Sequence, residues 1–212
     1  MVDNGLASMT NVKQPGGALP PAAGNGSADD TSAIQIIIDH VVLSNSTNKK
    51  VFFPPGEYLV TNDIVIKGSV ELHGTRIGIA VIKASTPYAN KIHNAKLPVR
   101  SVALNYLYFD GILLEFHGGA QGQLSTSSII VDSCVFFSTA QSRVSTARAR
   151  LGQLKLAFLE KSGVHKCVFL RDSNAFGVAS KFSNTVGVRV TGNICGLDLS
   201  KMRTGCLARL SQ

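Results

Sequence analysis

The chain has 212 residues, of which 44% are hydrophobic and 16% are charged; this apolar content suffices for one folded domain and excludes a largely disordered chain. Twenty glycines, seven prolines and the lack of tryptophan favour a turn-rich β protein over a helical bundle, and the lack of any run of about 18 apolar residues excludes a membrane-spanning helix. The 21 basic and 13 acidic residues give a net charge of +8, which favours anionic partners such as acidic polysaccharide or nucleic acid.

The cysteines predict neither a metal site nor a cofactor. The four are Cys134, Cys167, Cys195 and Cys206. They form no Cys-x-x-Cys pair and lack zinc-finger spacing to a histidine, so we expect reduced and mostly buried thiols. The first residues, with Asp3 and Asn4, lack the apolar run of a secretory signal, and the sequence leaves the localisation open.

The N-terminal part divides into an arm and a helix. Residues 1–27 are rich in Gly, Pro, Ala and Asn, and we expect a flexible arm there. After Asp29, apolar residues recur at helical spacing, which predicts an amphipathic helix over residues 31–43. The stripe consists of Ile34, Ile37, Ile38, Val41 and Val42. Ser32 and Gln35 fit a capping box at the start of this helix.

Short β-favouring segments follow, separated by turn residues. They are Val51–Phe53, Tyr58–Thr61, Ile64–Lys67 and Ser69–His73, with Pro-Pro-Gly, Asn-Asp and Lys-Gly between them. Strands this short and this frequent predict a wound or sandwiched all-β fold.

Internal repeats favour the wound fold. Four segments share one pattern, in which an apolar residue is followed after two variable positions by Leu, Cys or Asn and then, two residues later, by Phe or Cys. They begin at Leu104, Val131, Val164 and Val190. Irregular repeats of about 30 residues are typical of the coils of a parallel β-solenoid. We therefore expect an interior column of Leu107, Cys134, Cys167 and Asn193, and an aromatic column of Phe109, Phe136 and Phe169.

Three segments near the N-terminus carry a family resemblance. They are GNGSADDTSAIQIIIDH (Gly24–His40), KKVFFPPGEYLV (Lys49–Val60) and VELHGT (Val70–Thr75), and together they resemble the opening of the pectate lyase-like superfamily. The resemblance implies an all-β, right-handed parallel β-helix with an N-terminal capping α-helix, over residues 28–212 and with about six or seven coils. It also implies that Asp29 and Asp30 are structural, and that the superfamily's polysaccharide lyases, glycoside hydrolases, epimerases and phage tailspikes are the relevant functions.

The catalytic motifs of polygalacturonase-like hydrolases and of uronan epimerases are missing. The chain is also shorter than most such enzymes, which leaves three interpretations open: a reduced member, a part of a longer protein, or a chain whose open end is covered by a partner, as in a homotrimer or a virion. Whether the protein is an enzyme stays open on this basis.

Candidate site residues can be taken from equivalent offsets on neighbouring coils. β-Elimination of a uronic acid needs a cation and a base, and the candidates are His117, His165, Lys166 and Arg171. Hydrolysis needs two carboxylates about 5–10 Å apart, and the candidates are Asp110 with Asp132 or Asp172. Each has a structural interpretation as well: Asp110-Gly111 fits a turn, His117 fits a loop before two glycines, and one of His165 and Lys166 must face solvent.

Most of the positive charge lies in one segment. The segment from Arg143 to Arg171 contains seven basic residues and a single acidic residue, Glu160, which accounts for +6 of the net charge of +8. Arg148, Arg150 and Lys155 are candidates for binding an acidic polysaccharide, although a solvated face would look the same. Nucleic acid is the poorer partner because aromatic residues are not interleaved with the charges. Two hypotheses remain: a lyase or hydrolase of acidic polysaccharide, and a non-catalytic phage tailspike or virion protein.

Overall fold

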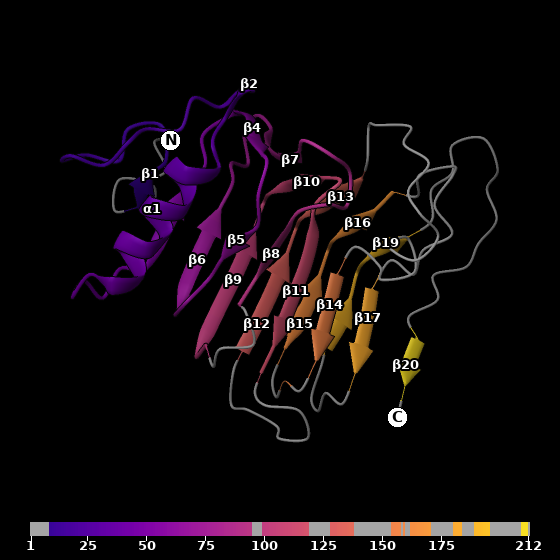
Figure 1. Cartoon of the computed structure of the whole chain (residues 1–212). Helices are drawn as coiled ribbons and strands as arrows, with labels where there is room; N and C mark the ends of the chain where they lie inside the picture. Colours follow the sequence, from indigo (N-terminus) through magenta and orange to yellow (C-terminus); the bar gives the residue numbers. More distant parts are fainter. Residues whose placement is uncertain are drawn as a thin grey trace.

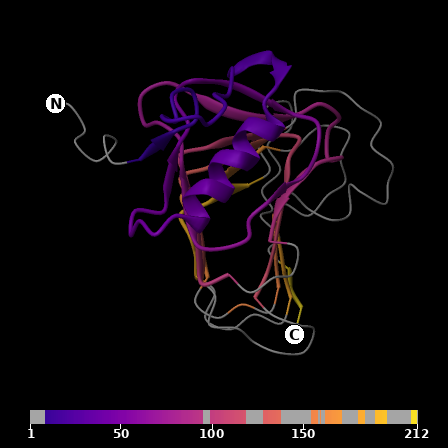
Figure 2. The same ribbon diagram turned by 60° about the vertical axis from the view of Figure 1, so that its left-hand side comes forward.

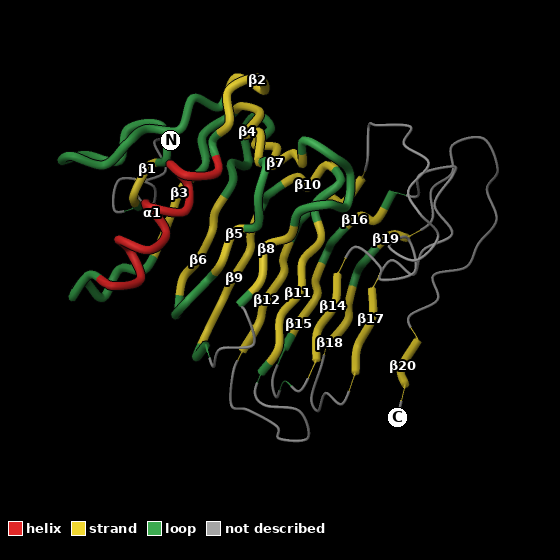
Figure 3. The backbone as a smooth tube through the Cα atoms, viewed as in Figure 1, coloured by secondary structure: helices red, strands yellow, loops and turns green. Residues whose placement is uncertain are grey.

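The computed structural model describes residues 9–94, 99–118, 128–137, 154–157, 159, 162–170, 180–183, 189–195 and 209–211. In this part of the chain, one helix stands at the N-terminal end of a stack of short strands (Figures 1 and 3). Within it no helix is long and apolar enough to cross a membrane.

The strands form three parallel sheets. Sheet A contains β1 (Thr10–Asn11), β3 (Lys50–Phe52), β6 (Val70–His73), β9 (Ser101–Asn105), β12 (Ser128–Asp132), β15 (Gly163–His165) and β18 (Arg189–Thr191). Sheet B contains β2 (Asn25–Asp29), β4 (Gly56–Val60), β7 (Ala80–Ala84), β10 (Tyr108–Asp110), β13 (Val135–Phe137), β16 (Val168–Phe169) and β19 (Ile194–Cys195). Sheet C contains β5 (Ile64–Val65), β8 (Lys91–His93), β11 (Leu113–His117), β14 (Leu154–Ala157), β17 (Ser180–Ser183) and β20 (Arg209–Ser211).

The chain passes through the three sheets in turn and then repeats. From β6 onward each strand pairs in parallel with the strand three places later in the chain, so that one coil stacks on the next. Apolar side chains from all three sheets point into the stack and form one core. The predicted parallel β-helix is confirmed, and the four strands expected between residues 51 and 73 correspond to β3, β4, β5 and β6.

Helix α1 (Thr31–Leu43) has the predicted bounds and covers the N-terminal end of the stack (Figure 2). Its residues Ile34, Ile37, Ile38 and Val41 are buried against β3, β5 and β6. The cap of the solenoid is therefore held on by the apolar stripe that the sequence shows.

The predicted capping box is wrong. The side chain of Gln35 turns away from the helix start and binds the backbone of Val65, donating to its carbonyl (2.9 Å) and accepting from its N–H (2.7 Å). The helix start is instead held by Asp29, whose Oδ1 accepts a hydrogen bond from the N–H of Thr31 (3.0 Å). The next residue, Asp30, accepts from the N–H groups of Ala23 (2.6 Å) and Gly24 (3.0 Å), in agreement with a structural role for both carboxylates.

Part of the segment expected to be a flexible arm packs on the solenoid. Strand β1 pairs with β3, beginning at Thr10, and Val12 and Ala22 are buried in the core. The N–H of Ala22 donates to the carbonyl of Val12 (2.8 Å). Two buried side chains among polar neighbours are too weak a pattern to be recognised in the sequence, which is why the expected boundary at residue 27 lies too far along the chain.

The four repeats are in register, as predicted. Leu104 pairs with Val131, Val131 with Val164 and Val164 with Val190. Each repeat turns from sheet A to sheet B through one residue with positive φ: Tyr106 (56°), Ser133 (53°), Lys166 (50°) and Gly192 (64°).

Both predicted interior columns form. Leu107, Cys134 and Cys167 are fully buried, and Asn193 continues the column by accepting from the N–H of Cys167 (2.7 Å). In the aromatic column, the ring centroids of Phe109 and Phe136 are 5.1 Å apart, and those of Phe136 and Phe169 are 4.6 Å apart and nearly parallel.

We expect Cys134 and Cys167 of the reduced protein to resist a thiol reagent until the chain unfolds, because neither side chain is exposed to solvent. Labelling followed by peptide mass mapping checks this, with urea-unfolded protein as the control in which both residues react. Rapid labelling of both in the native protein would contradict the register of the coils.

Candidate functional site

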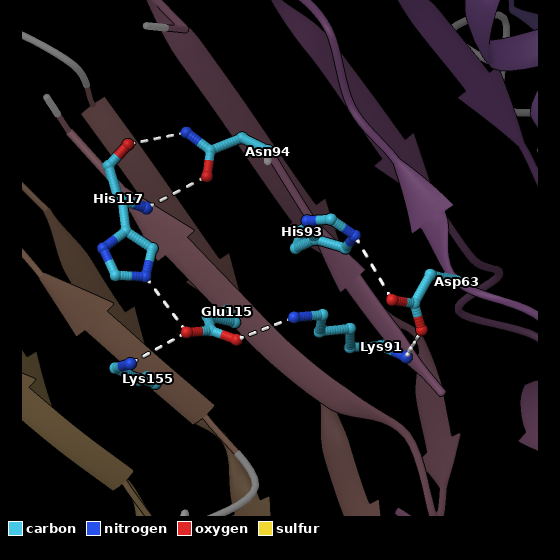
Figure 4. Close-up of polar contacts among 7 residues, drawn as sticks. All are labelled: Asp63, Lys91, His93, Asn94, Glu115, His117 and Lys155. Atoms are coloured by element: carbon cyan, nitrogen blue, oxygen red, sulfur yellow. Dashed lines mark hydrogen bonds and ion pairs between the residues drawn. The ribbon is translucent and has the colours of Figure 1, made fainter. Parts of the chain in front are cut away.

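The outward face of sheet C carries a cluster of polar side chains, shown in Figure 4. We call it, together with the buried Asn94 that adjoins it, the sheet C cluster; its members are Asp63, Lys91, His93, Asn94, Glu115, His117 and Lys155. The strands position it by alternation. In β11, Leu114 and Phe116 are buried, so Glu115 and His117 between and after them face outward.

Glu115 is the centre of the cluster. Its carboxylate accepts hydrogen bonds from the ammonium groups of Lys155 (2.8 Å) and Lys91 (3.2 Å), and its Oε1 lies 3.0 Å from Nε2 of His117. Partial burial acts to raise the pKa of Glu115, but the hydrogen bonds from Lys155 and His117 and the charges of both lysines outweigh it and lower the pKa to about 2. Glu115 is therefore ionised throughout the neutral range.

A second histidine–carboxylate pair lies on the neighbouring coils. Nε2 of His93 is 3.4 Å from Oδ2 of Asp63, and Oδ1 of Asp63 accepts a hydrogen bond from the backbone N–H of Lys91 (2.9 Å). Burial and the charge of Lys91 lower the pKa of His93, against the opposite effect of Asp63 and Glu115. The lowered pKa of His93 favours its neutral imidazole form.

Asn94 fixes the backbone of His117. It is fully buried, its Nδ2 donates to the His117 carbonyl (2.6 Å), and its Oδ1 accepts from the His117 N–H (3.1 Å). These two hydrogen bonds join β11 to the preceding coil at the residue where Glu115 also holds the imidazole ring. The ring is thus fixed both by its own backbone and by a carboxylate.

This arrangement suits proton transfer beside an anion more than it suits general-acid catalysis. A histidine held by a carboxylate can act as a general base, and the lysines supply positive charge. A carboxyl group whose pKa is about 2 holds no proton to donate at neutral pH. Among the described residues no group of three or more His, Cys, Asp or Glu side chains is placed to hold a metal ion.

The pairing of the strands places basic residues at one register position of successive strands, and we call these positions the basic column. Lys155 pairs with Lys181, and Lys181 pairs with Arg209, so three basic residues occupy the same register position on three successive strands of sheet C. Adjacent strands are about 4.8 Å apart. The column runs along the axis of the solenoid, away from Glu115.

The structure brings together only two of the predicted site residues. His117 and Lys155 meet at Glu115, whereas His165 lies on sheet A, with its Nδ1 2.7 Å from Oγ1 of Thr191. Lys166 is exposed at the turn that follows β15. The structure therefore does not bring His117 together with His165 and Lys166, because these residues belong to different faces of the solenoid.

Of the two expected carboxylate pairs, the structure places only Asp110 with Asp132, and it does not bring these two together. Asp110 is buried at the end of β10 in sheet B, whereas Asp132 is at the end of β12 in sheet A. The remaining candidates, Arg148, Arg150, Arg171 and Asp172, lie outside the described residues.

Sheet A carries a similar contact of a glutamate with a lysine and a histidine, on its strands β3 and β6 near the capping helix. Lys50 and His73 lie 3.0 Å and 3.1 Å from Oε2 of Glu71, and Nε2 of His73 is 3.2 Å from Nδ2 of Asn105. Glu71 is more exposed than Glu115, at 38% against 25% of the side chain. The triplet alone is therefore not diagnostic; what distinguishes sheet C is the second lysine, the second histidine pair and the basic column.

Five members of the cluster were missed in the sequence: Asp63, Lys91, His93, Asn94 and Glu115. The available signal was the alternation of polar and apolar residues in Lys91-Ile92-His93 and in Leu114-Glu115-Phe116-His117, which places the polar residues on one face. His117 was open to interpretation as a loop residue because two glycines follow it, but the strand includes it.

Comparison with known proteins gives one family match, by the model of the rhamnogalacturonase A/epimerase, pectate lyase-like family, over residues 10–103. Residues 10–103 are thus similar to a pectate lyase-like family. The matched part includes the capping helix as well as Asp63, Lys91 and His93, and it ends before Glu115 and His117.

Two solved structures are similar to this β-helix. The ORF18 protein of Geobacillus virus E2 has 15% identity and a TM-score of 0.40; the alignment covers 87% of this chain and 53% of the viral one, so the chain spans about half of that protein's length. A "putative glycosyl hydrolase" from Parabacteroides merdae has 10% identity and a TM-score of 0.38, over 80% of this chain and 92% of that one. No curated protein sequence matches the chain.

Proposed function

We propose that this chain is a carbohydrate-active protein that binds an acidic polysaccharide along the outward face of sheet C. The observation that carries the proposal is the sheet C cluster, in which Lys91 and Lys155 share the single carboxylate of Glu115. The two ammonium groups and the one carboxylate give this contact group one positive charge more than negative. The family match and the net charge of +8 support an anionic glycan as the ligand.

If the bound glycan is cleaved, β-elimination fits the cluster better than hydrolysis does. Elimination needs a base for the C5 proton and a cation near the uronate carboxylate. His117, held by Glu115 and by Asn94, would serve as the base, and Lys155 would serve as the cation. Hydrolysis would need a protonated carboxylic acid, and the low pKa of Glu115 argues against it.

The test is incubation of the protein with a panel of polyuronates and bacterial capsular polysaccharides. Absorbance of unsaturated uronates reports a lyase, and new reducing ends without that absorbance report a hydrolase. The His117→Gln variant is expected to lower kcat about 10²- to 10⁴-fold, as for loss of a general base. Lys155→Ala is expected to weaken glycan binding about tenfold, as for loss of a hydrogen bond to a charged group.

Lys50→Ala is the matched control, because Lys50 has the same kind of ion pair on sheet A. It should leave binding unchanged, and binding of the wild-type protein should weaken as salt rises. Equal losses in the Lys50 and Lys155 variants would contradict a site on sheet C. Salt-sensitive binding without any product would assign the protein to the alternative function, a non-catalytic tailspike or virion adhesin.

A further inference from the structure

Two thiols lie level with each other on consecutive coils, inside the solenoid and away from sheet C. The strands on either side of Cys134 and Cys167 pair in register, β12 with β15 and β13 with β16. Both side chains are fully buried, and both thiols are free. A single cysteine in a core is a common packing choice, but two at the same position of adjacent coils place sulfur next to sulfur.

The hydrogen bonds of the thiols show that the two side chains are placed equivalently on their coils. Each Sγ donates to the carbonyl two residues before it, Asp132 for Cys134 (3.4 Å) and His165 for Cys167 (3.3 Å). Each also donates to a carbonyl one coil back, Leu104 for Cys134 (3.4 Å) and Val131 for Cys167 (3.5 Å), and these two residues pair with each other. The neighbouring Cys134 thiol lowers the pKa of Cys167, whereas burial raises the pKa of Cys134.

We propose that Cys134 and Cys167 are a disulfide-forming pair that joins two consecutive coils under oxidising conditions. Strands in register are about 4.8 Å apart, and bridged cysteines have Cα atoms about 4.4–6.8 Å apart. Closure requires the two Cβ atoms to approach by roughly 0.5 Å, together with rotation about χ1. The identical orientation of the two side chains on neighbouring coils makes that a local change.

The reaction is a thiol–disulfide exchange with oxidised glutathione or an oxidoreductase disulfide. The thiolate of Cys167, whose pKa is the lower of the two, attacks one sulfur of the oxidant and releases one glutathione thiolate. The Cys134 thiolate then attacks the Cys167 sulfur of the mixed disulfide and releases the second. Two protein thiols are oxidised, one glutathione disulfide is reduced to two glutathiones, and the two protons pass from the cysteines to glutathione.

The bond would close a long loop in the chain. The two cysteines are 33 positions apart, and a cross-link over such a span stabilises a protein mainly by restricting its unfolded chain. The expected consequence is a solenoid whose middle coils are more resistant to heat in an oxidising compartment than in a reducing one.

The experiment uses the full chain, reduced and then held with excess oxidised glutathione in urea below the unfolding midpoint, so that transient opening admits the oxidant. After the remaining thiols are alkylated, peptide mass mapping should find a Cys134–Cys167 linked peptide. The melting temperature should rise by about 10 °C relative to the same sample kept in dithiothreitol. Cys195→Ser/Cys206→Ser should keep this gain, and Cys134→Ser should abolish it.

Two results would overturn the proposal. One is a wild-type peptide map in which both cysteines stay alkylated, or are linked to Cys195 or Cys206 instead. The other is a linked pair that leaves the melting temperature unchanged. The peptide map of the wild-type protein shows whether the Cys134–Cys167 bond forms even if a serine variant does not fold. None of these measurements depends on glycan binding.

Discussion

Replacing Phe136 with alanine is expected to lower the free energy of unfolding by about 3–5 kcal/mol. The Phe136 side chain is fully buried, and its ring is stacked between those of Phe109 and Phe169 on the neighbouring coils. Its removal deletes buried apolar surface, leaves a cavity and breaks two aromatic contacts at once. Because each coil buries its hydrophobic face only against its neighbours, the loss affects three consecutive coils.

The matched control is Phe137→Ala, the same substitution at the next residue of the same strand. Phe137 points to the opposite face of sheet B and is only partly buried, so we expect a loss of about 1 kcal/mol or less. Urea unfolding followed by circular dichroism measures both variants, with the m-value as the check on two-state behaviour. Similar losses in the two variants would contradict an interior aromatic column.

Those features of the fold that repeat along the chain could be predicted from the sequence. The stripe from Ile34 to Val41 has the spacing of a helix with one buried face, and it gave the bounds of α1 correctly. Phe109, Phe136 and Phe169 recur at the same offset from an apolar residue, and stacking of coils turns such an offset into a column. In both cases a local pattern repeated at a fixed spacing is sufficient to predict the structure. For the aromatic column this holds because each coil packs on its neighbours at equivalent positions.

The site could not be predicted in the same way. Glu115 and Lys155 are 40 positions apart, and the length of chain between their strands differs from coil to coil, so no fixed spacing links them. His117 and His165 were both candidates for one site, but they lie on sheets C and A. Assigning a residue to a sheet requires the register of all three strands of a coil, and the repeats recognised in the sequence covered only sheets A and B.

Hydrogen bonds from side chains to distant backbone groups were a second reason why the sequence-based predictions failed. Gln35 has the spacing of a capping box, yet its amide binds Val65 on a strand 30 positions away. Asn94 likewise binds the backbone of His117 on the next coil. Such contacts depend on which backbone groups the tertiary fold leaves open, and local sequence does not contain that information.

We expect Glu115→Gln to remove a pH-dependent part of the stability. The pKa of Glu115 is about 2 in the folded protein, against an ordinary value of 4.5. A depressed pKa stabilises the folded state at pH values above the unfolded pKa, and that contribution is lost as the pH falls from about 4.5 towards about 2. The shift corresponds to about 3 kcal/mol at most, and solvent screening of a side chain that is 25% exposed reduces this to about 1–2 kcal/mol.

The measurement is the difference in unfolding free energy between wild type and Glu115→Gln across pH 7 to 2, so that groups common to both proteins cancel. The variant should be less stable by about 1–2 kcal/mol at pH 7, because Lys91 and Lys155 lose their shared carboxylate, and the difference should shrink towards zero near pH 2. Glu71→Gln is the control: its carboxylate has one lysine and one histidine partner and is more exposed, so its difference should be smaller. A difference for Glu115→Gln that stays constant down to pH 2 would show that Glu115 contributes by packing and not by its charge, and would remove the electrostatic basis for a cation-rich site on sheet C.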